Sequence, residues 1–196
     1  MSWIETHSGA QFKYNEPEES WILIEDIAHA LANQCRYNGH CSRFYSVAEH
    51  SVLVSQVLPD ELKLYGLLHD AAEAYLGDVA KPQKDLPWMA EYKAYEHRVM
   101  AHIFNTLVGE VPDVEQRKAI HEADMDVLTR EAIELMVSEG SGWSATRDRV
   151  PADVKIVGWV PDVAEQWFTH KWIEYTEGGL DEDSLILATD KEVNPK

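Results

Sequence analysis

The sequence has little cysteine, few basic residues and no long apolar run, and each shortage excludes a class of protein. Two cysteines, Cys35 and Cys41, are too few for a disulfide framework and indicate free thiols in a reducing cytosol. No apolar run reaches the length of a membrane-spanning helix, and the N-terminal residues lack the basic start and apolar centre of a signal peptide. These absences predict a soluble, cytoplasmic protein with no membrane partner.

The shortage of basic residues argues against a nucleic-acid polymer as partner. Lys and Arg number 17 against 35 Asp and Glu, and the net charge is −18. A nucleic-acid-binding protein needs a basic stripe to replace condensed counterions. A small anionic substrate remains compatible, because a metal with two or three basic residues can hold a phosphate inside an acidic protein.

The apolar pattern predicts a single, mainly α-helical domain over residues 1–196 with a small N-terminal β-hairpin around Ser8-Gly9. The segment 140–160 is irregular, and the tail from Gly178 is acidic and expected to be loosely held. Ser46 with Glu49 predicts a capping box, and Asp60 a cap of the following helix. Helices are expected over residues 24–34, 46–58, 60–77, 88–108, 113–136 and 163–175.

The adjacent pair His69-Asp70 lies inside the apolar, alanine-rich run 65–78. Burying an imidazole beside a carboxylate is costly unless the groups are paired or bind a metal. His50 lies early in the preceding helix, and antiparallel packing of the two helices would bring it to His69. Asp124 is a further carboxylate in an apolar helical pattern. Two imidazoles and two carboxylates can bind a divalent transition metal and leave positions open for water and substrate.

Each of these residues also has an ordinary structural interpretation. A lone His50 fits a half-buried packing histidine, Asp124 a surface residue, and His69-Asp70 a hydrogen-bonded pair. The remaining histidines His97, His102, His121 and His170 are expected in surface or helix-packing positions.

Three segments resemble the HD-domain phosphohydrolases, whose motif is His…His-Asp…Asp. They are VAEHSVLVS (47–55), LLHDAAEAYLGDVAKPQK (67–84) and HEADMDVL (121–128). The resemblance is to the branch of YfbR-type 5′-deoxynucleotidases and of phage enzymes that hydrolyse dATP. It implies an HD-domain helical bundle with its core at about residues 20–138. The connection from His50 to His69 is shorter than in the bacterial 5′-deoxynucleotidases, and residues 140–196 show no resemblance.

The resemblance also implies roles for individual residues. One divalent cation (Co, Mn, Zn, Fe or Mg) would be bound by His50, His69, Asp70 and Asp124. Catalytic roles fall to Glu73, which would orient or deprotonate water, and to Asp78, which would contact the sugar or protonate the leaving oxygen. Phosphate would be bound by Arg36, Lys84 and Lys81, and Tyr37 would pack against deoxyribose. Each assignment has a purely structural alternative: a salt bridge for Glu73, a helix end at Gly77-Asp78, and solvated loop positions for Arg36 and Arg43. For Arg43 the solvated loop position is preferred.

The expected function is a metal-dependent phosphohydrolase that converts dATP to deoxyadenosine and triphosphate and that also accepts dADP or dAMP. The alternatives are a 5′-deoxynucleotidase acting on deoxynucleoside monophosphates, a phosphodiesterase for a cyclic or signalling nucleotide, and a non-catalytic nucleotide sensor. The relatives implied by the resemblance favour a homo-oligomer, with Trp88 or Trp172 as a contact, in the cytoplasm of a bacterium or of a phage-infected host.

Overall fold

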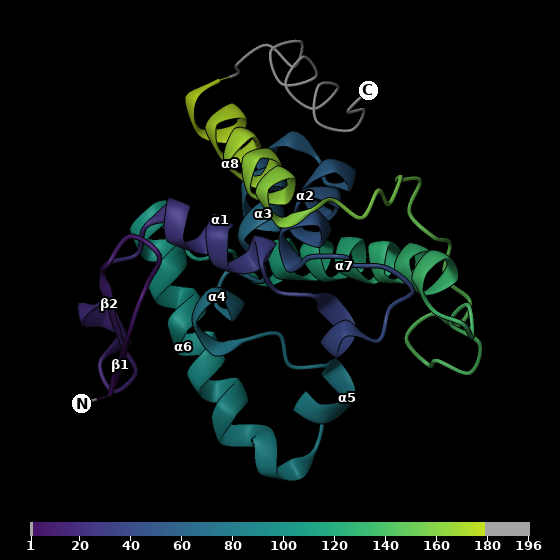
Figure 1. Ribbon diagram of the computed structural model, residues 1–196, viewed down its shortest axis with the longest axis horizontal. Helices are drawn as coiled ribbons and strands as arrows, with labels where there is room; N and C mark the ends of the chain where they lie inside the picture. Colours follow the sequence, from purple (N-terminus) through teal and green to yellow (C-terminus); the bar gives the residue numbers. More distant parts are fainter. Residues whose placement is uncertain (1, 179–196) are drawn as a thin grey trace, which may run out of the picture.

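The computed structural model describes residues 2–178, which form a mainly helical fold with a two-stranded hairpin at the N-terminus (Figure 1). This confirms the expected fold class. The elements in chain order are β1 (Trp3–Glu5), β2 (Gln11–Lys13), η1 (Pro17–Glu19), α1 (Ile24–Ala32), η2 (Arg36–Gly39), α2 (Val47–Val57), α3 (Asp60–Leu68), α4 (Glu73–Leu76), α5 (Lys81–Lys84), η3 (Pro87–Met89), α6 (Ala90–Leu107), α7 (Val114–Leu135) and α8 (Pro161–Glu177).

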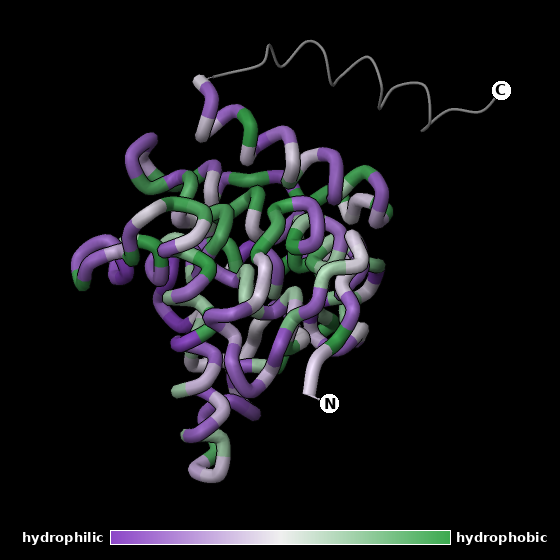
Figure 2. Tube along the Cα trace, turned by 90° about the vertical axis from the view of Figure 1, so that its left-hand side faces the viewer, coloured by the Kyte–Doolittle hydropathy of each residue, from purple (hydrophilic) through white to green (hydrophobic). Residues whose placement is uncertain are grey.

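Helix α2 occupies the centre of the molecule. Every residue from 47 to 55 is buried, and α2 contacts α1, α3, α7 and α8. A helix that is covered on all sides belongs in a core. In Figure 1, α8 lies across α2 and α3, and α7 passes beneath them. Figure 2 shows the hydrophobic segments gathered within the body of the fold, while the projection at the bottom of that view is largely hydrophilic.

The hairpin pairs Trp3 with Lys13 and Glu5 with Gln11 in antiparallel register, as the sequence predicts. Its anchor is Phe12, which is fully buried and stacks on Tyr75 with ring centroids 4.2 Å apart. The hydroxyl of Tyr14 donates to the backbone carbonyl of Tyr75. The hairpin is therefore held against α4, which begins at Glu73.

Of the two expected helix caps, Ser46 caps α2 but without the full capping box, and Asp60 is wrong. The Ser46 hydroxyl accepts a hydrogen bond from the Glu49 amide, but the Glu49 carboxylate does not complete the capping box. It accepts instead from the backbone amides of Val157, Gly158 and Trp159, because these donors precede α8 and have no partner of their own in a helix or sheet. Asp60 is the first residue of α3 and not its cap, since the capping position falls on Pro59.

The expected continuous helix over 60–77 is also wrong. Helix α3 ends at Leu68 and α4 begins at Glu73. Between them the backbone bonds tighten to the i→i−3 pattern, with Ala71 donating to Leu68 and Glu73 donating to Asp70. The apolar spacing continues through this turn, so periodicity alone gives no sign of the break.

Several surface expectations are resolved by the same structure. Arg43 is not simply solvated: it donates to the Ile156 carbonyl at 3.1 Å. Trp88 is 67% exposed, whereas Trp172 is half-buried and packs against the core. Within residues 2–178, no helix is both long and apolar enough to cross a membrane. The acidic tail expected from Gly178 onward lies almost wholly outside the described residues.

Candidate metal centre

Side chains from three parts of the chain converge on one point of the core. His50 extends from α2, His69 and Asp70 from the turn after α3, and Asp124 from α7. His50 Nε2 lies 3.2 Å from His69 Nε2 and 3.2 Å from Asp124 Oδ1. Asp70 Oδ2 lies 3.3 Å from His69 Nε2 and 3.6 Å from His50 Nε2. The structure thus brings together the four residues that the sequence predicted as metal ligands.

These separations fit a common metal ion. A nitrogen or oxygen ligand binds a divalent transition metal at about 2.1 Å, so neighbouring ligands lie about 3.0 Å apart in octahedral and about 3.4 Å apart in tetrahedral geometry. The shortest separations in the cluster fall in this range. The ligand atoms of His50, His69 and Asp124 all lie within 4.8 Å of one another, and this buried cluster could hold a metal ion.

The hydrogen bonds of both histidines leave Nε2 available as a ligand. His50 Nδ1 donates to Glu131 Oε1 at 2.5 Å, and His69 Nδ1 donates to the carbonyl of Gly66 at 2.7 Å. Each Nδ1 proton is thereby committed, which places the Nε2 lone pair toward the cluster in the neutral imidazole. Metal-binding histidines are commonly oriented in this way by a carboxylate or a backbone carbonyl.

The break between α3 and α4 creates this arrangement. The amide of His69 is 3.5 Å from the Gly66 carbonyl, and the same carbonyl accepts the His69 ring proton. The backbone at His69, with φ −60° and ψ −29°, has the values of a 3₁₀ turn. The tightened turn directs both His69 and Asp70 to the cluster.

Sequence reasoning missed Glu131, which is fully buried and accepts four donors. Besides His50, they are the Tyr45 hydroxyl at 2.8 Å, the Tyr37 hydroxyl at 2.5 Å and Arg36 Nη2 at 3.2 Å. Arg36 and the hydrogen bonds outweigh burial and hold the pKa of Glu131 well below its usual value. A signal was present in the sequence, because a residue seven positions after Asp124 lies on the same face of a helix.

The cluster carries mixed charges when no ion is bound. Burial lowers the pKa of His69, but Asp70 and Asp124 outweigh it and raise that pKa to about 9. Burial and Arg36 also lower the pKa of His50, yet Glu131 and Asp124 leave it raised. The pKa of Asp70 is depressed despite burial, because His69, His50 and Arg36 lie beside it. A bound cation would take over the positive charge that protons supply here.

Glu73 is buried at the start of α4. Its Oε1 accepts from Lys84 Nζ at 3.1 Å, and its Oε2 has no hydrogen-bond partner among the described residues. Burial, together with Asp70 and Asp78, raises the pKa of Glu73 well above its usual value. Lys84 also donates to Glu96 at 2.7 Å. The structure therefore joins Glu73 and Lys84, for which the sequence predicted separate roles.

Arg36 reaches the cluster from a short loop that follows α1. An antiparallel bridge between Cys35 and Ser46 closes this loop, and the Arg36 amide donates to the Tyr45 carbonyl. The guanidinium contacts Asp70 Oδ2 at 3.5 Å, while its Nε is buried without a partner among the described residues. Arg36 is therefore not a solvated loop residue.

Tyr37 follows Arg36 in a left-handed conformation, with φ 57°. This conformation is uncommon for a residue other than glycine and often marks a functional position. Its ring lies 5.5 Å from the Arg36 guanidinium and 6.0 Å from the ring of Trp143. Cys35 and Cys41 of the same loop are free thiols, as expected, with their sulfur atoms 3.6 Å apart.

The other two predicted residues differ in position. Asp78 lies just after α4, and burial raises the pKa of its carboxyl, partly offset by Arg36. Gln34 fixes it in place by accepting from the Asp78 amide and donating to the Glu73 carbonyl. Lys81 is exposed and lies 3.8 Å from Asp85. The structure brings Asp78 near the cluster but gives Lys81 no contact with a cluster residue among those described.

Comparison with known proteins identifies relatives whose names assign no activity. The chain is 41% identical over 143 residues to the uncharacterized protein YfdR of Escherichia coli (strain K12). The aligned region covers 73% of this chain and 78% of YfdR. It is 40% identical over 92 residues to an uncharacterized protein of Rhodobacter capsulatus, covering 42% of this chain and 47% of that protein. No family model matches the chain.

Proposed function

The chain belongs to the family of the Escherichia coli protein YfdR, and we propose that it is a metal-dependent phosphohydrolase of the HD-domain type that acts on deoxynucleotides. The favoured reaction is hydrolysis of dATP to deoxyadenosine and triphosphate. The observation that carries this proposal is the convergence of His50, His69 and Asp124, with Asp70 beside them, at separations suited to one ion. The substrate class is inferred from the sequence resemblance.

His50, His69, Asp70 and Asp124 would hold the ion. Two imidazole donors favour a transition metal such as Co²⁺, Mn²⁺, Zn²⁺ or Fe²⁺ over Mg²⁺, which prefers oxygen ligands. When bound, the ion supplies acidification of water and neutralises charge on a phosphoryl oxygen. Glu131 and the Gly66 carbonyl would keep both rings in the tautomer that presents Nε2.

Glu73 would orient the attacking water through its unpartnered Oε2, which lies in a buried position next to Asp70. Burial and the neighbouring carboxylates raise its pKa, so the ionised form that takes up the proton of the water would require the positive charge of a cation bound beside Asp70. Lys84 holds the other oxygen, which fixes the direction of the carboxylate. A general base of this kind contributes about 10²- to 10⁴-fold to a rate.

Arg36 would bind a phosphate of the substrate, since a guanidinium matches paired phosphate oxygens and its Nε is unpartnered. Tyr37, beside it, would contact the deoxyribose. Asp78 would contact the sugar or give a proton to the leaving oxygen, and its raised pKa favours the protonated form that such a donor needs. Water adds to the α-phosphorus, the bond from phosphorus to the 5′-oxygen breaks, and that oxygen gains a proton.

An assay of nucleoside release tests the proposal. Protein loaded with Co²⁺ or Mn²⁺ is incubated separately with each common deoxynucleoside triphosphate and monophosphate, and the products are separated by chromatography. Deoxyadenosine and triphosphate from dATP are expected. Release from monophosphates alone would replace dATP hydrolysis by 5′-deoxynucleotidase activity. Nucleotide binding without any release would indicate a sensor and contradict the proposed enzyme.

A further inference from the structure

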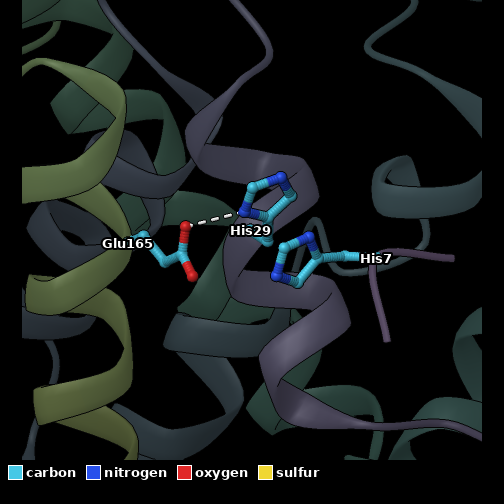
Figure 3. A group of neighbouring side chains, drawn as sticks. All are labelled: His7, His29 and Glu165. Carbon is cyan, nitrogen blue, oxygen red and sulfur yellow. Dashed lines mark hydrogen bonds and ion pairs between the residues drawn. The ribbon is translucent and has the colours of Figure 1, made fainter. Parts of the chain in front are cut away.

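A second group of metal-binding side chains lies outside the centre described above and shares no residue with it. Figure 3 shows His7 of the hairpin turn, His29 of α1 and Glu165 of α8 gathered at one place. One ligand atom from each lies within 4.8 Å of the others. His29 Nδ1 is 2.8 Å from Glu165 Oε2. Three segments far apart in the sequence thus contribute two imidazoles and a carboxylate.

The turn that carries His7 is fixed to the helix that carries His29. Asp26 of α1 is 2% exposed and accepts the Ser8 amide at 2.6 Å and the Thr6 and Ser8 hydroxyls at 2.8 Å. Asp26 and His29 are three positions apart, so they lie on one face of α1. The carboxylate of Asp26 therefore holds the turn, and His29 on the same helix faces the imidazole of His7, which the turn carries. Such support for a ligand is typical of a built site and unusual for surface residues that meet by chance.

The two rings are stacked when no ion is bound, with centroids 3.7 Å apart and planes inclined by 15°. Both present a nitrogen toward the Glu165 carboxylate (Figure 3). Two ligands of one ion lie about 3.0 to 3.4 Å apart with their lone pairs converging, so binding requires the rings to splay. His7 is exposed at the tip of the hairpin, where a change of side-chain rotamer is inexpensive.

A cavity adjoins the group and leaves room for further ligands. Its volume is about 320 Å³, and its lining includes His7, Asp26, His29 and Tyr75. Two histidines and one glutamate are a donor set that binds Zn²⁺ while leaving positions for water. The carboxylate oxygens of Asp26 already accept hydrogen bonds from the turn, so water from the cavity side would complete the coordination.

We propose that His7, His29 and Glu165 bind a divalent transition-metal ion, such as Zn²⁺, that clamps the N-terminal hairpin to α1 and α8. Borderline ions with a preference for imidazole are the expected class, because a single carboxylate is too few oxygen ligands for Ca²⁺ or Mg²⁺. The bound ion would add a second attachment of the hairpin to the helices, besides the stacking of Phe12 on Tyr75 of α4.

Calorimetric titration of metal-stripped protein with Zn²⁺ tests this site. The wild-type chain is expected to bind one more equivalent than His7→Ala, or to bind that equivalent at least tenfold more tightly. His97→Ala is the matched control, since His97 is exposed and belongs to neither group. It should titrate like the wild type. Because the comparison counts the difference between variants, it holds whether or not the His50 centre binds zinc.

His7 makes no hydrogen bond within residues 2–178, and circular dichroism should show His7→Ala folded like the wild type. Glu165→Gln, which keeps the size of the side chain, provides a second variant and should lose the same equivalent. Identical stoichiometry and affinity in the wild type, His7→Ala and Glu165→Gln would overturn the proposal.

Discussion

Glu131 joins the candidate centre to its surroundings through four accepted hydrogen bonds. Its carboxylate accepts from His50, which is a ligand in the proposed enzyme, and from Arg36, which would bind phosphate. One buried acid thus orients both groups. The residues named from the motif were predictable, because a buried His-Asp pair needs an explanation wherever it occurs. Glu131 lies on the helical face of Asp124, but this signal is weak because a single acid in a long helix that bears many others resembles a surface residue.

Glu131→Gln should lower metal affinity by about 10- to 100-fold, the usual effect of removing a carboxylate that orients a ligand histidine. The amide keeps the volume of the side chain but no longer compensates the charges of His50 and Arg36. Metal titration measures the effect, and thermal unfolding shows that the variant is folded. Tyr45→Phe removes another donor to the same carboxylate and should alter metal affinity much less. Unchanged affinity in Glu131→Gln would assign Glu131 to stability alone.

Asp70→Ala and Glu73→Ala separate metal binding from water activation. Asp70→Ala should lose the bound metal, because it removes a carboxylate 3.3 Å from His69 Nε2. Glu73→Ala should keep metal and nucleotide but lose turnover by about 10²- to 10⁴-fold. Metal analysis and nucleoside release on the same preparations give both values. Equal loss of metal in the two variants would show that Glu73 is itself a ligand.

Metal affinity should increase with pH, because the ion competes with a proton on His69. The pKa of this imidazole is raised from 6.5 to about 9 in the ion-free fold. For each proton displaced, affinity should rise by about tenfold per pH unit through this window and level off above it. The same proton stabilises the ion-free fold fully below pH 6.5, and that contribution is lost as pH rises through about 9. Titrations across the window measure the slope, and a flat profile would contradict the assignment.

At the scale of elements, the sequence predicted a helix or strand correctly wherever its apolar spacing fitted only one kind of secondary structure. The hairpin and the long helices α6 and α7 follow their patterns closely. The apolar spacing gave no sign of the break after Leu68, because His69, Asp70 and Ala71 fit the spacing of a continuing helix equally well. The break is accompanied by a local side-chain contact that the apolar period does not encode: the His69 ring donates to the Gly66 carbonyl. The bonds from the amides of residues 157–159 to Glu49 are long-range contacts, which local patterns do not contain.

Gly66→Ala tests the close approach of α2 and α3 that brings His50 to His69. A Cβ at this position would lie 2.4 Å from Leu58 Cδ1 and 3.2 Å from the Ser55 Cα. We expect a loss of about 1 to 3 kcal/mol in the free energy of unfolding, typical of overpacking. Adding Leu58→Ala should relieve part of the clash and recover part of the lost free energy of unfolding. A double-mutant cycle of urea unfolding would show this as a favourable coupling energy. A stabilised Gly66→Ala, as helix propensity alone would give, would mean that the helices are farther apart.

At the scale of the whole molecule, an acidic chain encloses two basic side chains near the candidate centre. The chain carries a net charge of −18, yet Arg36 is buried with carboxylates around it and Lys84 joins Glu73 to Glu96. Both cations are thus paired with acidic side chains at or beside the candidate centre. The net negative charge of the chain would disfavour extended polyanions, whereas buried cations can still bind a small anion.

The most direct test of the proposed enzyme measures nucleoside released from a deoxynucleotide by one preparation in three states: metal-loaded, stripped with chelator, and reloaded with Co²⁺ or Mn²⁺. Release should fall to background on stripping and return on reloading, and reloading should not restore it in Asp124→Ala. Release that persists unchanged after stripping and in Asp124→Ala, or that is absent from the loaded protein, would contradict a metal-dependent phosphohydrolase at this centre.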